Sequence, residues 1–188
     1  MSKDFLRFMR DRVSKNQLVE PAPSKAEWHE ILDAASRAAD HGGLKPWRFQ
    51  VYSGEGREQV GQAYWLHAKA EVPELSDDKA VTFIKKAFRA PAIVLVYADL
   101  VDHPKVPQFE QLMAASAAAQ QVLLGLDALG YGGMWRTGPA VFTDTAKDLF
   151  GLEPNQHVVG LIYAGTASHI PPRVEDTGVT ERVTFIDQ

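Results

Sequence analysis

The sequence contains no cysteine. This absence excludes disulfide bonds, thiolate catalysis, iron–sulfur clusters and any zinc site that uses cysteine ligands. It is also typical of proteins that stay in a reducing compartment. The N-terminal stretch "MSKDFLRFMRDRV" carries too many charges for a signal peptide, and the two observations together predict a cytoplasmic protein.

Long hydrophobic runs and a strong excess of one charge are also missing. The most apolar stretch, residues 111–126, is too short to span a bilayer, so we expect no membrane partner. A formal net charge of -4 and an isoelectric point near 5.9 give no reason to expect a nucleic-acid partner. The chain shows no repeat and no low-complexity linker, and we therefore expect one domain over residues 1–188.

Several motifs that would identify an enzyme class are absent. "GYGG" at 130–133 follows a helix-like run and has Trp135 where a dinucleotide-binding loop needs its third glycine. There is no Gly-x-x-x-x-Gly-Lys-Ser/Thr loop and no Gly-x-Ser-x-Gly nucleophile. None of the six histidines has a second histidine four positions later, so we expect no metal site.

What is present is a pattern of helices with a few scattered strands. Apolar periodicity predicts helices over 4–14, from Ser24 to Asp40, and over 57–70, 76–89, 107–129 and 144–150. Ser24 with Glu27 forms a capping box, and Thr143 is a helix cap. Strands are predicted over 47–53, 92–98, 131–137 and 157–165. These elements predict an α+β fold with a small central sheet that helices cover.

Two of these helices carry further expectations. The helix from Ser24 should turn Trp28, Ile31, Leu32, Ala35 and Ala39 toward the core. The alanine-rich run at 114–119 allows very close approach by another element of the chain or by another subunit.

The first of three polar patches follows the first helix. It consists of Arg10, Arg12, Ser14 and Lys15. Basic residues at a helix C-terminus suit the helix dipole, so the patch can be an ordinary solvated helix end. A forked guanidinium beside a hydroxyl also suits a phosphate or the edge of a planar ring, so anion recognition is the alternative.

The second patch is the bend "ADHGGLKPWRF" at 39–49, together with Arg37. The glycines and the proline are explained by a helix that ends and a strand that begins. His41 and Lys45 are not explained in this way, and they can meet polar atoms of a ligand.

The third patch is "GGMWRTG" at 132–138. One interpretation is a bulged strand with a tryptophan that packs in the core. The other is a backbone that approaches a flat ligand closely, with Arg136 and Thr137 at the charged end of that ligand.

Taken together, these pieces resemble a known family. "RDRVS" with "EPAPS", "RAADHGGLKPWRF", "APAIVLVYA", "HPKVPQFEQLMAASAAAQ" and "LGYGGMWRTGP" follow one another from about residue 8 to residue 165. Their order and spacing are similar to those of the nitroreductase family of FMN-dependent oxidoreductases, in particular its small YdjA-like subgroup.

The resemblance implies an intertwined homodimer of nitroreductase-like fold, whose small central sheet is mixed or antiparallel and flanked by helices. It also implies FMN at the subunit interface, touched by both subunits. It places a set of residues on the flavin: Arg12, Val13, Ser14, Arg37, His41, Trp135, Arg136 and Thr137. It links a second set to the nicotinamide nucleotide: Gly125, Leu126, Asp127, Ala128, Leu129 and Gly130. Gly43 and Lys45 stand where larger relatives carry Asn and Gln, and we expect them at the substrate pocket.

The function that the resemblance implies is hydride transfer from NADH or NADPH, through bound FMN, to a nitroaromatic or quinone-type acceptor in a ping-pong cycle. The flavin carries this chemistry, so no catalytic side chain is expected. Three alternatives stay open: another acceptor chemistry on the same scaffold (dehalogenation or dehydrogenation), an FMN-binding or carrier protein with slow turnover, and a dimeric α+β module without flavin.

Overall fold

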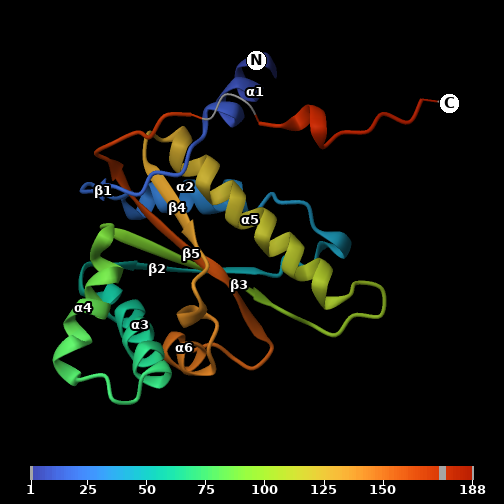
Figure 1. Ribbon diagram of the computed structural model, residues 1–188. Coiled ribbons are helices and arrows are strands. Elements are labelled where there is room, and N and C mark those ends of the chain that lie inside the picture. The colour runs from blue at the N-terminus through green and yellow to red at the C-terminus, as the bar shows by residue number, and fades with distance from the viewer. Residues whose placement is uncertain (1, 174–176, 188) are drawn as a thin grey trace.

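The computed structural model describes residues 2–173 and 177–187. Helices cover both faces of a five-stranded sheet (Figure 1). The strands are β1 (Leu18–Val19), β2 (Trp47–Ser53), β3 (Ala92–Asp99), β4 (Gly132–Arg136) and β5 (Gln156–Ala167). The helices are α1 (Ser2–Asp11), α2 (Lys25–Ala35), α3 (Arg57–Glu71), α4 (Ala80–Ile84), α5 (Gln108–Ala128) and α6 (Asp144–Phe150). Short 3-10 turns lie at His41–Gly43, Gly54–Gly56, Asp77–Lys79, Lys85–Arg89, Pro139–Val141 and Val179–Glu181.

The sheet has the order β1-β5-β3-β2, and β4 also pairs with β5. Every strand pair is antiparallel, which settles the choice between a mixed and an antiparallel sheet. The strand predicted over 47–53 is confirmed without change. The strands predicted over 92–98 and 157–165 are also confirmed, and most of their residues are buried on both faces.

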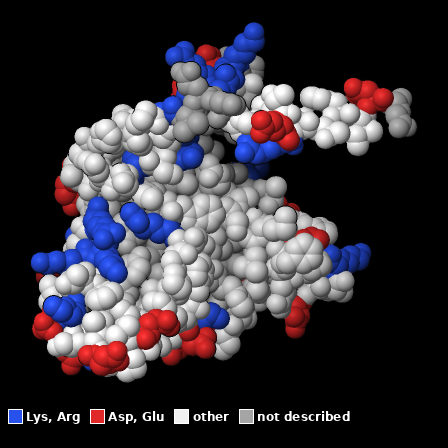
Figure 2. Space-filling view, in the orientation of Figure 1, with Lys and Arg blue, Asp and Glu red and all other residues white. Residues whose placement is uncertain are grey.

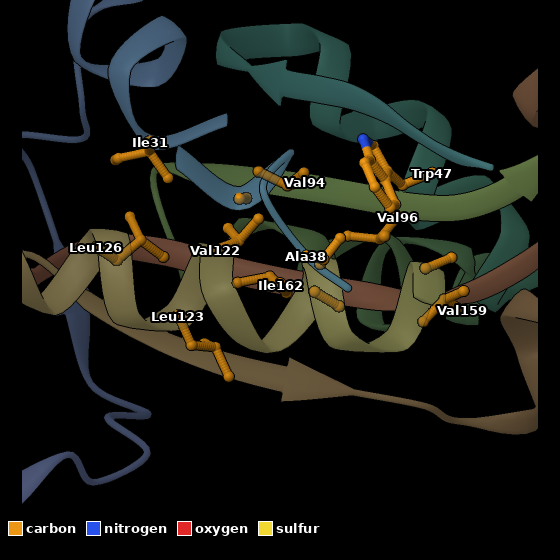
Figure 3. Packing of buried hydrophobic residues seen from close by; sticks show 14 of the residues in the cluster. Ile31, Ala38, Trp47, Val94, Val96, Val122, Leu123, Leu126, Val159 and Ile162 are labelled. Carbon is orange, nitrogen blue, oxygen red and sulfur yellow. The ribbon is translucent and has the colours of Figure 1, made fainter. Parts of the chain in front are cut away.

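The two faces of the sheet carry separate hydrophobic cores. On one face, α2 and α5 pack over the sheet through residues such as Ile31, Val122 and Ile162 (Figure 3). On the other face, α3 and α6 cover a cluster that includes Leu95 and Leu161. Since neighbouring residues of a strand point to opposite faces, the continuous apolar runs of β3 and β5 supply both cores.

The alanine-rich part of α5 packs within the chain. Ala115, Ala118 and Ala119 have no exposed surface, and they belong to the hydrophobic cluster that α5 shares with α2 and the sheet. The sequence allowed either another element of the chain or another subunit to pack against this run. For these three alanines, other elements of the same chain fill that position. Gly125 continues the close contact, because a Cβ there would lie 3.0 Å from a methyl carbon of Ile31.

One predicted helix and two helix ends differ from the prediction. Over 76–89 the chain forms only the short helix α4, with 3-10 turns at Asp77–Lys79 and Lys85–Arg89 on either side of it. The first helix ends at Asp11 instead of residue 14, because the chain then becomes extended beside β4. α2 ends at Ala35 instead of Asp40: the Ser36 hydroxyl bonds the Leu32 carbonyl and the chain turns. As a result Ala38 is buried and Ala39 is exposed, so the prediction that Ala39 faces the core is wrong.

The helix caps agree with the prediction. The backbone N–H of Ser24 donates to the Glu27 carboxylate at 2.8 Å, and the N–H of Glu27 donates to the Ser24 hydroxyl at 3.3 Å. The Thr143 hydroxyl accepts from the backbone N–H of Ala146 at 3.1 Å. Within the described ranges, no helix combines the length and the apolar character that crossing a membrane would require.

Candidate functional site

The segment that follows α1 is fixed to the end of α5 and the start of β4. The backbone N–H of Lys15 donates to the Gly133 carbonyl at 3.0 Å, which places the segment along the outer edge of β4. The Lys15 ammonium pairs with the Asp127 carboxylate, and the two side chains are only 14% and 10% exposed. Arg12, Val13 and Ser14 precede this anchor; the first two are half-buried and Ser14 is exposed.

β4 carries the third sequence patch along β5. Trp135 lies opposite Ile162 and Arg136 opposite Leu161, so the two side chains point to opposite faces of the sheet. Gly160 makes room for the Trp135 indole, since any Cβ there would collide with the indole nitrogen. Trp135 Nε1 and Arg136 Nε are buried without a hydrogen-bond partner in the part of the chain that the structure describes.

A hollow of about 390 Å³ opens beside this strand. Residues 134–138, at the end of β4 and just after it, line one part of this hollow. The other lining residues come from other elements: Tyr64, Lys86, Arg89 and Tyr163. For Lys86, Arg89 and Arg136 no ion pair forms with any described residue. Figure 2 shows Lys and Arg side chains gathered to the left of where Figure 1 places β4. Unpaired cations that converge on a hollow suit a ligand with negative charge.

Two tyrosines form the floor of this hollow. The Tyr64 and Tyr163 hydroxyl oxygens lie 3.0 Å apart, and the Tyr163 hydroxyl donates to the Lys86 carbonyl at 3.2 Å. The Arg136 guanidinium lies over the Tyr163 ring, 5.2 Å from its centroid. Burial raises the pKa of Tyr163 and the pKa of Tyr64. Both hydroxyls are therefore neutral near pH 7 and act as hydrogen-bonding groups rather than as bases.

Lys86, Arg89, Tyr64 and Tyr163 were not predicted as site residues. Lys86 and Arg89 stand in "IKKAFRAP", which from the sequence alone looks like the solvated basic end of a helix. Only the packing of α3 and the 3-10 turn Lys85–Arg89 against the sheet brings them beside β4. No local signal in the sequence identifies them.

The bend at 40–45 has an unusual backbone. Gly42, Gly43 and Lys45 have φ values of 77°, 68° and 49°, all in the left-handed region. Lysine rarely adopts this conformation, and here the Asp40 carboxylate stabilises it by accepting from the backbone N–H of Lys45 at 2.6 Å. A Cβ on Gly42 would lie 3.2 Å from a Val106 methyl, whereas a Cβ on Gly43 would meet nothing within 4 Å.

His41 is held by the first turn of α5. Its Nδ1 lies 2.7 Å from the Glu110 carboxylate, and both residues line a shallow hollow of about 310 Å³ with Met113, Ala114 and Ala117. Arg37 is exposed and its side chain bonds no described residue. The structure thus places His41 at a hollow, while Arg37 lies on the surface near the end of α2.

The segment predicted to meet the nicotinamide nucleotide forms the end of α5. Leu126 is fully buried, Gly125 packs on α2, and Asp127 is paired with Lys15. Residues 128–130 are exposed, and Gly130 ends the helix with a φ of 82°. The first three residues therefore have contacts within the chain, and only 128–130 offer free surface.

The predicted flavin residues fall into two groups within one chain. α5 has 21 residues, which at about 1.5 Å per residue gives roughly 30 Å between its ends. Residues 12–15 lie at its C-terminal end through Asp127, and His41 lies at its N-terminal end through Glu110 (Figure 1). Within one chain, residues 12–15 therefore lie beside β4, whereas residues 37–45 lie at the other end of α5, away from both.

Comparisons with known proteins agree with this fold. The model of the family described as "Nitroreductase family" matches residues 9–166. YdjA of Escherichia coli (strain K12), whose NAD(P)H nitroreductase name is provisional, is 37% identical over 164 residues, which is 87% of this chain and 88% of YdjA. A similarly named protein of Haemophilus influenzae is 30% identical over 164 residues, again 87% of this chain and 88% of the relative.

Solved structures show the same architecture. A nitroreductase-like family protein from Bacillus cereus superposes with a TM-score of 0.82 at 23% identity, covering 97% of this chain and 96% of its own. The FMN-dependent nitroreductase NfnB from Mycobacterium smegmatis, solved in complex with NADPH, gives 0.75 at 16% identity, with 99% of both chains covered. The family model spans most of the chain and the identity to YdjA extends over nearly the same residues, so this protein belongs to the nitroreductase family and is an oxidoreductase.

Proposed function

We propose that the chain is an FMN-dependent NAD(P)H oxidoreductase that reduces nitroaromatic or quinone-type acceptors. The observation that carries the proposal is the hollow beside β4, which is lined by Lys86, Arg89 and Arg136 together with the side chains of Tyr64 and Tyr163. None of the three cations forms an ion pair with a described residue, and Arg136 Nε is buried there without a partner. A flat, partly anionic ligand such as a flavin matches that combination. The names of the relatives supply the electron donor, NADH or NADPH, for which the chain itself shows no preference.

The residues present fit a flavin. Arg136 Nε is a buried donor that lacks an acceptor, and desolvated donors of this kind cost stability unless a ligand satisfies them. Lys86, Arg89 and Arg136 would hold the anionic part of the cofactor, and Arg12 and Ser14 would approach from the edge of β4. Bound FMN would supply the two-electron chemistry, which no side chain of the chain can perform.

The chain's own groups would stabilise negative charge in the site. Guanidinium and ammonium groups fixed in a hollow stabilise an anion strongly, because they need no reorganisation when the charge develops. The neutral hydroxyls of Tyr64 and Tyr163 keep the floor of the hollow ordered through their mutual hydrogen bond. No nucleophile or metal enters this scheme.

A homodimer with shared sites is part of the proposal. If both predicted flavin groups contact one FMN, a second copy must supply one of them, because the two lie at opposite ends of α5. Large apolar side chains without cover support a second copy: Phe5 and Leu6 on α1 are each 56% exposed, and Phe185 and Ile186 in the C-terminal tail are 82% and 83% exposed. Figure 1 shows α1 and the tail projecting from the body.

The test uses the purified full-length chain. Bound FMN should colour it yellow, NADH or NADPH should bleach that colour without oxygen, and a quinone or nitroaromatic should restore it. Sedimentation at low micromolar concentration should give a dimer. A colourless protein that takes up no added FMN would refute the proposal, and bound FMN that neither donor reduces would favour a flavin carrier.

A further inference from the structure

The contact between His41 and Glu110 joins two parts of the chain that the sequence separates by 69 positions. His41 lies in the bend at 40–45, and Glu110 lies in the first turn of α5. The helix dipole interacts favourably with a carboxylate in this first turn. The bend is held in position from both sides, since Asp40 binds the backbone N–H of Lys45 and Glu110 binds the imidazole.

The chemistry of the contact fixes the position of a proton. A carboxylate only accepts hydrogen bonds, so the histidine nitrogen that faces it must carry hydrogen. His41 Nδ1 lies 2.7 Å from Glu110 Oε2, and Nδ1 is therefore the protonated nitrogen of the neutral ring. Nε2 then holds the free lone pair, and it has no partner in the described part of the chain. The other charged side chain at this hollow, Asp40, is engaged with the bend itself.

We infer that Glu110 is a positioning residue: it holds His41 in the Nδ1–H form, so that Nε2 can accept a proton from water and donate it to the acceptor. This inference rests on the proposed function and on its shared site: within one chain His41 lies at the other end of α5 from residues 12–15, so the flavin and acceptor beside His41 would be held by the hollow of a second copy. Asp40 and Glu110 line the hollow with His41, and among the residues that the structure describes no lysine or arginine lines it.

The proton balance of the reaction shows what Nε2 would supply. Two-electron reduction of a quinone consumes one hydride equivalent from the reduced cofactor and one further proton, and both quinone oxygens end as hydroxyls. A nitro group consumes the same two equivalents and loses one oxygen as water, which gives a nitroso group. In each case Nε2–H breaks as the acceptor oxygen gains its proton, and water returns a proton to Nε2 afterwards.

The first measurement needs no flavin. Nitrogen-15 NMR of the full chain separates protonated from unprotonated ring nitrogens, and His41→Gln assigns the signals. The wild type should show protonated Nδ1 and unprotonated Nε2. Glu110→Gln keeps an acceptor and should keep this form, Glu110→Ala should shift it toward Nε2–H, and the control Glu74→Ala, an exposed glutamate elsewhere, should change nothing. An unchanged tautomer in Glu110→Ala would overturn the inference.

The second measurement uses the flavin-loaded enzyme. Reoxidation by a quinone should slow about tenfold or more in Glu110→Ala, because an oriented proton donor contributes at least that much. Reduction by NADPH takes no proton from Nε2 and should slow less than reoxidation does, and Glu110→Gln should recover part of the loss. Wild-type reoxidation in Glu110→Ala would also overturn the inference. Failure of the proposed function is distinguishable, since it would appear in the wild type as absent FMN or absent bleaching.

Discussion

Breaking the ion pair between Lys15 and Asp127 can decide between two possible roles of Asp127. The family resemblance links Asp127 to the nicotinamide nucleotide, whereas the structure pairs it with Lys15 and so fixes residues 12–14 beside β4. If the pair is structural, Asp127→Asn and Lys15→Met should each lower the free energy of unfolding and weaken FMN binding. If Asp127 binds the nucleotide directly, Asp127→Asn should raise KM for NAD(P)H and leave stability unchanged.

The expected magnitude follows from burial. Removing one partner of a buried ion pair costs about 3–5 kcal/mol, because the other charge stays buried without compensation. The two side chains keep 14% and 10% of their surface exposed, so solvent screens the remaining charge in part and we expect a loss at or just below the lower limit of this range. A loss of about 2–3 kcal/mol corresponds to a Tm decrease of roughly 4–12 °C for a chain of this length.

A double-mutant cycle provides the assay. Urea unfolding of the wild type, both single variants and the Lys15→Met/Asp127→Asn double variant should give a coupling energy of about 1–3 kcal/mol. Asp148→Asn, an exposed carboxylate on α6, is the matched control and should stay within about 0.5 kcal/mol of the wild type. Additive single effects would show that the two charges do not stabilise each other, and the structural role of Asp127 would be refuted.

Three further predictions concern the hollow and the bend. Gly43→Asn should lower the free energy of unfolding by less than about 1 kcal/mol, because asparagine tolerates positive φ and a Cβ at this position meets nothing within 4 Å. Gly42→Asn should lower it more, because a Cβ there would lie 3.2 Å from a methyl carbon of Val106. Equal losses in urea unfolding would contradict this distinction. Lys86→Ala or Arg89→Ala should weaken FMN binding about ten- to a hundredfold with little change in Tm, and wild-type affinity in both would remove them from the site. Tyr163→Phe tests the pKa of Tyr163, which burial raises in the folded protein. Because the folded protein holds the phenol proton more tightly than the unfolded chain does, Tyr163 contributes to the free energy of unfolding. This contribution is fully present below the unfolded pKa of about 10 and is lost as the pH rises above it. The wild type should therefore lose stability more steeply than Tyr163→Phe above about pH 10, and parallel pH curves would contradict this.

The sequence by itself determined the elements and the family. The strand at 47–53 and the caps at Ser24 and Thr143 are local features: alternation of side chains and hydrogen bonds within four residues produce them, and both can be read from neighbouring letters. The ordered motifs from residue 8 to residue 165 predicted a nitroreductase, and the family match confirms this. The end of α2 was predicted wrongly, because the side-chain bond of Ser36 to the backbone competes with helical periodicity.

Only the tertiary structure decided which of these residues meet. Lys86 and Arg89 share a hollow with Arg136 for two reasons. Antiparallel pairing places β4 beside β5, and α3 packs on the same face of the sheet together with the turn that follows α4 and contains the two cations. Asp127 contacts Lys15 and Glu110 contacts His41, each across more than 60 positions of sequence. Along α5, Glu110 and Asp127 are separated by roughly 25 Å at about 1.5 Å per residue, so this helix is the spacer between the two candidate site segments. Such distances depend on how rigid helices cross a sheet, and a local pattern carries no information about them, because packing joins residues by shape and not by their order in the chain.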